Sequence, residues 1–125
     1  MKKKFLRCPI CGNLVEVIND SNVPIICCGK PMEELVANTT DGATEKHVPV
    51  VEENNKLVTI TVGENLHPMA EEHYIMWIHV FTNLREFHFD LKSGDNPEVK
   101  FHKDINEEIL EVNAYCNLHG LWRAN

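Results

Sequence analysis

The feature that most constrains this chain is the placement of its cysteines. Four of the five, Cys8, Cys11, Cys27 and Cys28, lie within the first 28 residues, whereas Cys116 lies near the C-terminus. All seven histidines lie after residue 36. Because two ligand chemistries divide so sharply along 125 residues, the sequence predicts a small thiol-rich domain over residues 1–36 and a histidine-bearing domain over residues 37–125.

The remaining composition indicates where the protein is located and whether its cysteines form disulfides. No run of 18 apolar residues is present, so no membrane-spanning helix is expected. The basic opening MKKKFLRC lacks the apolar stretch of a signal peptide, and the expected location is therefore the cytoplasm. Thiols stay reduced there, so five cysteines indicate metal or redox chemistry rather than disulfides.

The net charge of −7 is unevenly distributed. Residues 1–36 carry five basic and four acidic side chains, and residues 37–125 carry seven basic and fifteen acidic ones. An acidic body without a basic stripe argues against nucleic acid as a partner.

The first 36 residues predict a four-thiolate metal site. Cys8 and Cys11 form a Cys-x-x-Cys turn, and Cys27 and Cys28 follow as an adjacent pair. Such a turn lets two sulfurs converge on one ion, so four thiolates indicate a tetrahedral site for iron or zinc. A segment this short cannot bury a sufficient core, and we expect the metal to hold its fold. Adjacent cysteines should strain the site; structural zinc and a vicinal disulfide are the alternatives.

Beyond residue 36 the hydrophobic pattern repeats every second residue. Residues 56–63, 86–92 and 108–116 alternate apolar and polar side chains, and residues 73–81 are apolar on both faces, as in a central strand. Turn sequences such as SGDNP separate these segments. The sequence therefore predicts an all-β protein, in which the small four-thiolate metal domain precedes an immunoglobulin-like β-sandwich.

Four histidines are placed as ligands would be. They lie in loops or at strand ends, where a β-scaffold can direct several side chains at one point. Cys116, three residues before the last of them, can join the group. The set consists of His47, His67, His73 and His119. His79 is expected to be packed in the core, and His88 and His102 are expected on the surface.

Four imidazoles and one thiolate exceed the four ligands of a closed zinc site and suit iron. A thiolate opposite an open position pushes electron density toward a bound oxygen species. The residues thus predict a mononuclear iron site for redox chemistry on oxygen species. A blue-copper site using Met69 or Met76 is the second interpretation. A two-metal electron carrier and a zinc-ribbon interaction module are the non-enzymatic alternatives.

Three motifs resemble the signatures of superoxide reductases, namely EKHVPV, HPMAEEHYI and CNLHGLW. The leading CPICG and CCGKPM motifs resemble the desulforedoxin-type iron domain that is fused to such a reductase in two-iron desulfoferrodoxins. The resemblance covers essentially the whole chain.

The resemblance implies two mononuclear iron ions. The first would be bound by the four N-terminal cysteines, where zinc could replace it in recombinant material. The second would be bound by Nδ1 of His119, by Nε2 of the other three histidines in the same plane, and by Cys116 as axial ligand.

The resemblance also implies an enzymatic reaction, the one-electron reduction of superoxide to hydrogen peroxide without release of dioxygen. Glu45 would cap the ferric ion, and Lys46 would lie beside the open ferrous site. A rubredoxin-like protein would donate electrons, and the chain would form a homodimer.

Overall fold

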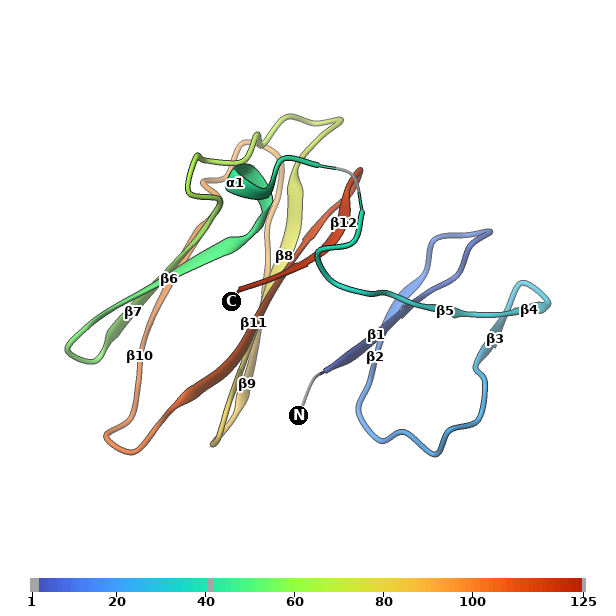
Figure 1. Ribbon diagram of the computed structural model, residues 1–125, viewed down its shortest axis with the longest axis horizontal. Coiled ribbons are helices and arrows are strands. Elements are labelled where there is room, and N and C mark those ends of the chain that lie inside the picture. Colours follow the sequence, from blue (N-terminus) through green and yellow to red (C-terminus); the bar gives the residue numbers. More distant parts are fainter. Residues whose placement is uncertain (1–2, 41, 125) are drawn as a thin grey trace. The chain divides into compact units, whose positions relative to one another are not determined.

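In the computed structural model, which describes residues 3–40 and 42–124, strands account for almost all of the regular structure (Figure 1). The chain divides into two compact units, Met1–Val36 and Ala37–Asn125. The one helix among the described residues, α1 (Thr44–His47), is a single turn. No described helix has the length and apolar character that crossing a bilayer requires.

The first unit is a small antiparallel sheet with a separate hairpin. The sheet has the order β2-β1-β5, formed by Leu14–Val17, Lys4–Arg7 and Glu33–Glu34. The hairpin pairs β3 (Ile26–Cys27) with β4 (Lys30–Pro31). Among the described residues of this unit, only Phe5, Leu6 and Cys8 are buried. Three side chains are a small core even for a domain of this size.

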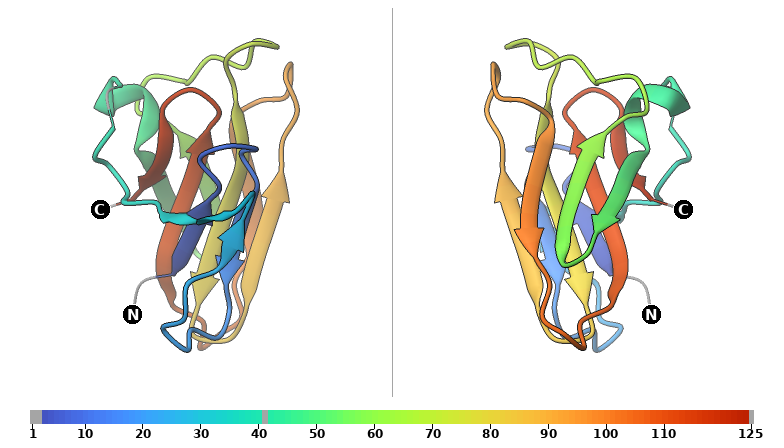
Figure 2. Two further views of the ribbon diagram at one scale, coloured as in Figure 1. Left: turned by 90° about the vertical axis from the view of Figure 1, so that its right-hand side faces the viewer. Right: turned by 90° about the vertical axis from the view of Figure 1, so that its left-hand side faces the viewer.

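The second unit is a sandwich of two antiparallel sheets (Figure 2). One sheet has the order β10-β7-β6, formed by Glu98–His102, Leu57–Val62 and Pro49–Asn54. The other has the order β12-β11-β8-β9, formed by Gly120–Arg123, Ile109–Cys116, Ile75–Thr82 and Glu86–Asp90. The prediction of an all-β fold with a β-sandwich is confirmed.

The alternating pattern explains which side chains form the sandwich core. Val58, Ile60 and Val62 point inward from β7, and Val112, Ala114 and Cys116 point inward from β11. Strand β8 is largely buried on both faces, as its uninterrupted apolar run predicted. Side chains of both sheets therefore share one buried cluster, which supports the loops at the strand ends.

The sandwich gathers three of its connections at one end (Figure 1). These are α1, which leads into β6, the segment between β7 and β8, and the turn between β11 and β12. The pairing of β11 with β8 shifts register between Tyr115 and Cys116. A local irregularity of this kind redirects side chains at the end of a strand. The chain then reverses through Gly120, whose φ of +79° suits a residue without a side chain.

Candidate metal centres

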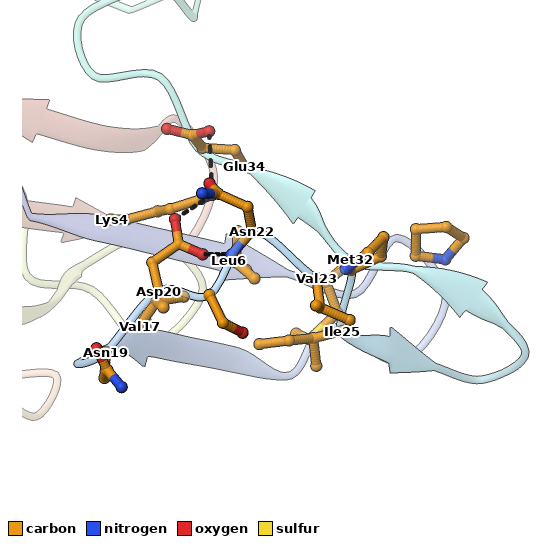
Figure 3. Close-up of a pocket in the computed structure, with 13 residues that line it drawn as sticks. Lys4, Leu6, Val17, Asn19, Asp20, Asn22, Val23, Ile25, Met32 and Glu34 are labelled. Carbon is orange, nitrogen blue, oxygen red and sulfur yellow. Dashed lines mark hydrogen bonds and ion pairs between the residues drawn. The ribbon is translucent and has the colours of Figure 1, made fainter.

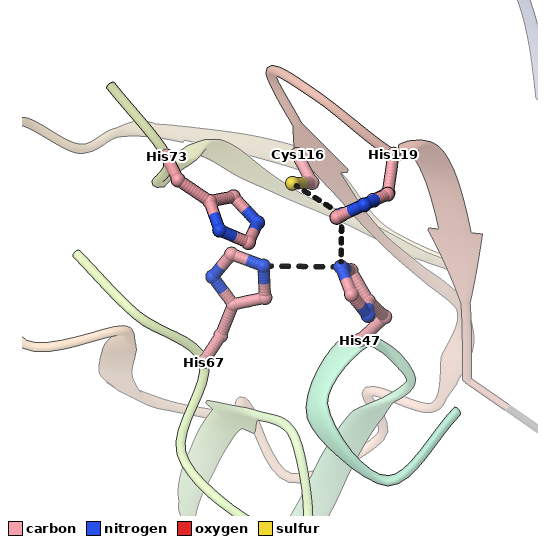
Figure 4. Close-up of side chains that lie close together, drawn as sticks. All are labelled: His47, His67, His73, Cys116 and His119. Carbon is pink, nitrogen blue, oxygen red and sulfur yellow. Dashed lines mark hydrogen bonds between the residues drawn. The ribbon is translucent and has the colours of Figure 1, made fainter. Parts of the chain in front are cut away.

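Five side chains from these connections converge on one point of the sandwich (Figure 4). One nitrogen or sulfur atom from each lies within 4.8 Å of those of all the others. His47, His67 and Cys116 are buried, and His73 and His119 are half-buried. All five residues that the sequence predicted for the second metal are thus brought together.

The four imidazoles stand at the corners of a square. Around the circuit of His47, His67, His73 and His119, neighbouring ring centroids are 4.5, 4.7, 5.0 and 4.8 Å apart. The diagonal from His47 to His73 is longer, at 6.3 Å. Neighbouring ring planes are nearly perpendicular, at 72–86°. The sulfur of Cys116 completes the group, 3.7 Å from His119 Nδ1.

Backbone carbonyls fix which nitrogens face the centre. His47 Nδ1 donates to the Ala43 carbonyl at 2.7 Å, and His67 Nδ1 donates to the Pro68 carbonyl at 2.6 Å. Because a carbonyl only accepts, each Nδ1 carries the proton, and each neutral ring has a bare Nε2. These two Nε2 atoms are 3.1 Å apart. Two lone pairs at this distance repel each other, and a cation between them removes the repulsion.

The unpartnered groups of the cluster also fit a metal ion. His73 Nε2 is buried and has no hydrogen-bond partner within residues 3–40 and 42–124. Burial lowers the pKa of His47 and His73, and it lowers that of His67 to about 4. These imidazoles are therefore neutral at pH 7, which is the form that binds metals. Burial raises the pKa of the Cys116 thiol, so a metal must displace its proton.

Asn117 was not singled out in the sequence, yet it holds one ligand in place. Its Oδ1 accepts the Tyr74 N–H at 3.0 Å, and its Nδ2 donates to the Glu72 carbonyl at 3.0 Å. The two bonds clamp the backbone on both sides of His73. The position of Asn117 between Cys116 and His119 was the available signal, because side chains next to metal ligands often orient the site.

Glu45 and Lys46 precede His47 in α1, and both are exposed. The Glu45 carboxylate is not among the converging ligand atoms. Its residue instead lines a recess of about 420 Å³ together with Pro49 and Glu64. The positive charge of Lys46 contributes to the lowered pKa of His73, after the larger effect of burial. Both charges therefore act on the cluster, Lys46 on His73 and Glu45 on His47, although the Glu45 carboxylate is not one of the converging ligand atoms.

The four cysteines of the first unit form a second group, whose sulfurs lie within 4.8 Å of one another. All five cysteines of the chain are free thiols. The Ile10 and Cys11 N–H groups each donate to Cys8 Sγ at 3.4 Å. These bonds lower the pKa of Cys8 to about 6, the Cys11 N–H having the largest effect. Backbone N–H groups thus favour the thiolate form.

The adjacent cysteines occupy a two-residue hairpin turn. Cys27 pairs with Lys30, and the residues between them, Cys28 and Gly29, have φ values of +52° and +74°. Two positive φ angles are what a type I′ turn requires. The left-handed backbone of Cys28 therefore costs about 1–2 kcal/mol, whereas strain in the metal site itself stays a prediction.

A cavity of about 420 Å³ in the first unit is separate from the thiolates (Figure 3). Lys4 Nζ lies 3.0 Å from Asp20 Oδ2 and 3.9 Å from Glu34 Oε1 at its wall. These charges pair with each other, and apolar residues such as Leu6 and Val17 line much of the rest. None of the four cysteines lines this cavity.

Comparisons with known proteins match both units. The model of the desulfoferrodoxin family matches residues 39–125, and that of the desulfoferrodoxin N-terminal domain matches residues 2–35. A desulfoferrodoxin homolog from Methanothermobacter thermautotrophicus is 47% identical, over 95% of each chain. The desulfoferrodoxin from Syntrophotalea carbinolica is 45% identical, over 98% of this chain and 96% of its own.

Solved structures agree with the family models. The crystal structure of the superoxide reductase from Treponema pallidum has a TM-score of 0.81, with 30% identity and full coverage of both chains. The matches span the four-thiolate unit as well as the sandwich that gathers four imidazoles and a thiolate. The chain belongs to the desulfoferrodoxin family.

Proposed function

We propose that this protein is a superoxide reductase, which converts superoxide to hydrogen peroxide at an iron ion bound by His47, His67, His73, His119 and Cys116. The observation that carries the proposal is the square of four imidazoles beside the buried sulfur of Cys116. This donor set would hold an iron ion, which would supply one-electron redox chemistry. The likeness to a solved superoxide reductase supports it.

The reaction is a one-electron reduction. An iron ion held by the four imidazoles and Cys116 would supply the electron, and the Cys116 thiolate would favour its transfer outward. Superoxide takes up one electron and two protons, its O–O bond stays intact, and hydrogen peroxide leaves. A rubredoxin-like protein then returns one electron to the centre. No second superoxide is oxidised, so no dioxygen is released.

Lys46 provides the attraction that the sandwich as a whole lacks. Residues 37–125 carry fifteen acidic and seven basic side chains, so their net charge repels an anion. A cation at the edge of the site can still focus an approaching anion, because the field there depends on nearby charges. The exposed Lys46 ammonium, whose charge already acts on His73, steers superoxide and helps to deliver a proton, directly or through water.

Glu45 makes the centre a reductase rather than a dismutase. Its exposed side chain lies two residues before His47 and lines an open recess. In this proposal the Glu45 carboxylate would turn from the recess toward the oxidised centre. Its negative charge there would hinder a second superoxide from giving up its electron, and it would favour departure of the product.

The first unit binds a second iron ion through its four cysteines, and zinc can take the same place. The tetrahedral thiolate set accepts both metals. We further propose that the protein is cytoplasmic and forms a homodimer, as the family resemblance implies. The small core of the first unit favours a partner.

The yield of dioxygen tests the proposed reaction. Iron-loaded protein is reduced and mixed anaerobically with superoxide, while hydrogen peroxide and dioxygen are both measured. We expect one hydrogen peroxide for each superoxide consumed and no dioxygen. One dioxygen for every two superoxide ions would show a dismutase, and no consumption above that of the Cys116→Ser variant would favour an electron carrier.

A further inference from the structure

One side of the imidazole square joins two distant segments of the chain. His47 and His119 are 72 residues apart in sequence, yet Nε2 of the first is 3.0 Å from Nδ1 of the second. His67 and His73, in contrast, both lie in the connection between β7 and β8. The separation of His47 from His119 therefore depends on contacts between α1 and the β11–β12 turn.

Trp122 makes such a contact with both ligands. Its indole stacks on the His47 ring, with centroids 4.7 Å apart and planes 28° from parallel. Its Nε1–H donates to the His119 carbonyl at 3.0 Å. The indole is only 2% exposed, and its residue pairs with Ala114 of β11. A buried ring on a paired strand is a rigid support for both ligands.

The chain packs closely around this pair of ligands. A Cβ atom on Gly42 would lie 3.1 Å from His47 Cε1, 3.1 Å from Trp122 Cζ2 and 3.3 Å from His119 Cγ. A methyl group would therefore fit there only if these rings shifted by a few tenths of an ångström. Thr40 adds a hydrogen bond from its hydroxyl to the His119 carbonyl, which the Trp122 N–H also reaches.

We propose that Trp122 is a positioning residue of the metal centre, which fixes His47 relative to His119 and so sets one side of the square. This inference rests on the proposed metal-binding function, but it concerns affinity and ligand geometry rather than turnover. Ligands already held at their bonding separation lose little freedom when the ion binds, so their rigidity increases affinity. Groups that orient ligands commonly change metal affinity about 10–100-fold.

The Trp122→Phe variant tests the proposal, because phenylalanine can still stack on His47 but has no N–H for the His119 carbonyl. Co²⁺ alone is titrated into the metal-free protein, and binding is followed at the thiolate-to-cobalt band that Cys116→Ser removes. This choice of band separates the sandwich centre from the four-thiolate centre. We expect the dissociation constant to rise about tenfold and the band to shift.

Trp77→Phe is the matched control, because Trp77 is the only other tryptophan and is also buried. Its ring stacks on Tyr115 at 5.6 Å. We expect the cobalt affinity of this variant to remain within about twofold of the parent, the variation ordinary for a substitution outside the site. Equal affinity and an unshifted band in Trp122→Phe would overturn the positioning role.

Gly42→Ala provides a second test that removes no buried atoms. The new methyl group presses on the two stacked rings and the His119 ring from an exposed position. We expect weaker cobalt binding, whereas Gly94→Ala, which adds a methyl with nothing within 4 Å, should bind as the parent does. If Trp122→Phe does not fold, Gly42→Ala decides, and parental affinity in it refutes the proposal. If Cys116→Ser leaves the whole titration unchanged, the proposed metal-binding function fails instead.

Discussion

The two units of this protein relate metal and fold in opposite ways. In the described part of the first unit only Phe5 and Leu6 are buried besides Cys8, and two of the four cysteines, Cys11 and Cys28, are exposed. In the sandwich, eight of the nine residues of the buried cluster are not metal ligands, and backbone carbonyls orient His47 and His67. The comparison indicates that the first unit needs its metal in order to fold. The sandwich, in contrast, folds through its own core and thereby places its metal ligands.

Removal of both metals should give the largest effect. Structural thiolate sites contribute about 10 kcal/mol or more of apparent binding free energy, which a core of three side chains cannot replace. We expect the metal-free protein to lose amide protection in β1 and β2 while β8 and β11 remain protected. Hydrogen exchange followed by mass spectrometry measures this. Equal loss of protection in the sandwich would break the distinction between the units.

Single cysteine substitutions should separate fold from activity. Cys116→Ser removes one ligand from a site whose scaffold remains, so we expect superoxide reduction to fall by about 100-fold or more, in the upper range for disturbed metal sites, with little change in thermal midpoint. Cys8→Ser should instead lower the thermal midpoint of the first unit, which it unfolds, and should change superoxide reduction little. Thermal melts and superoxide assays on both variants check this. A large drop in the thermal midpoint of the sandwich in Cys116→Ser would contradict a site that the fold forms in advance.

Lys46→Ala should produce a smaller, purely electrostatic effect. A local cation can raise the association rate of an anion tenfold or more, so we expect about a tenfold slower reaction with superoxide and a weaker dependence on salt. Lys56→Ala, which lies in the turn between β6 and β7, serves as the control. Stopped-flow measurements at several ionic strengths measure the rates. An unchanged salt dependence in Lys46→Ala would remove the steering role.

The stability of the sandwich should also depend on pH, because one of its carboxyl groups has a shifted pKa. Hydrogen bonds from Arg85, the largest cause, and from Thr82 lower the pKa of Glu107 to about 2. The pKa of an unfolded glutamate is near 4.5, so the unfolded state binds more protons between these values. The stabilisation is thus full above about pH 4.5 and is lost as pH falls toward 2. Denaturant melts of Glu107→Gln should show a smaller loss over that range, and an unchanged slope would contradict this.

The sequence predicted those features that depend on local pattern. Strands β7, β8, β9 and β11 followed from alternation or from a continuous apolar run, because burial on one face or two leaves that mark. Val48, which precedes Pro49, has the extended backbone that a residue before proline favours, with φ −71° and ψ 122°. His47 itself, however, ends a single helical turn, and four residues are too few to give a helical pattern in the sequence. His79 is buried and His88 is exposed, as expected.

The contacts that complete the site could not be read from the sequence. Asn117 clamps a segment more than forty residues away, and Trp122 stacks on a histidine from another connection. Such pairs become neighbours only when the two sheets have packed. The recess beside Glu45 likewise depends on the path of β6 and on Glu64 in a later loop.

The most direct test of two different centres in one chain is the visible spectrum during stepwise anaerobic oxidation, with iron counted per chain. We expect two iron ions and two bands that titrate separately. One band should come from the four thiolates, and the other should vanish in Cys116→Ser. A single intense copper–thiolate band, or a colourless protein after iron reconstitution, would contradict the account.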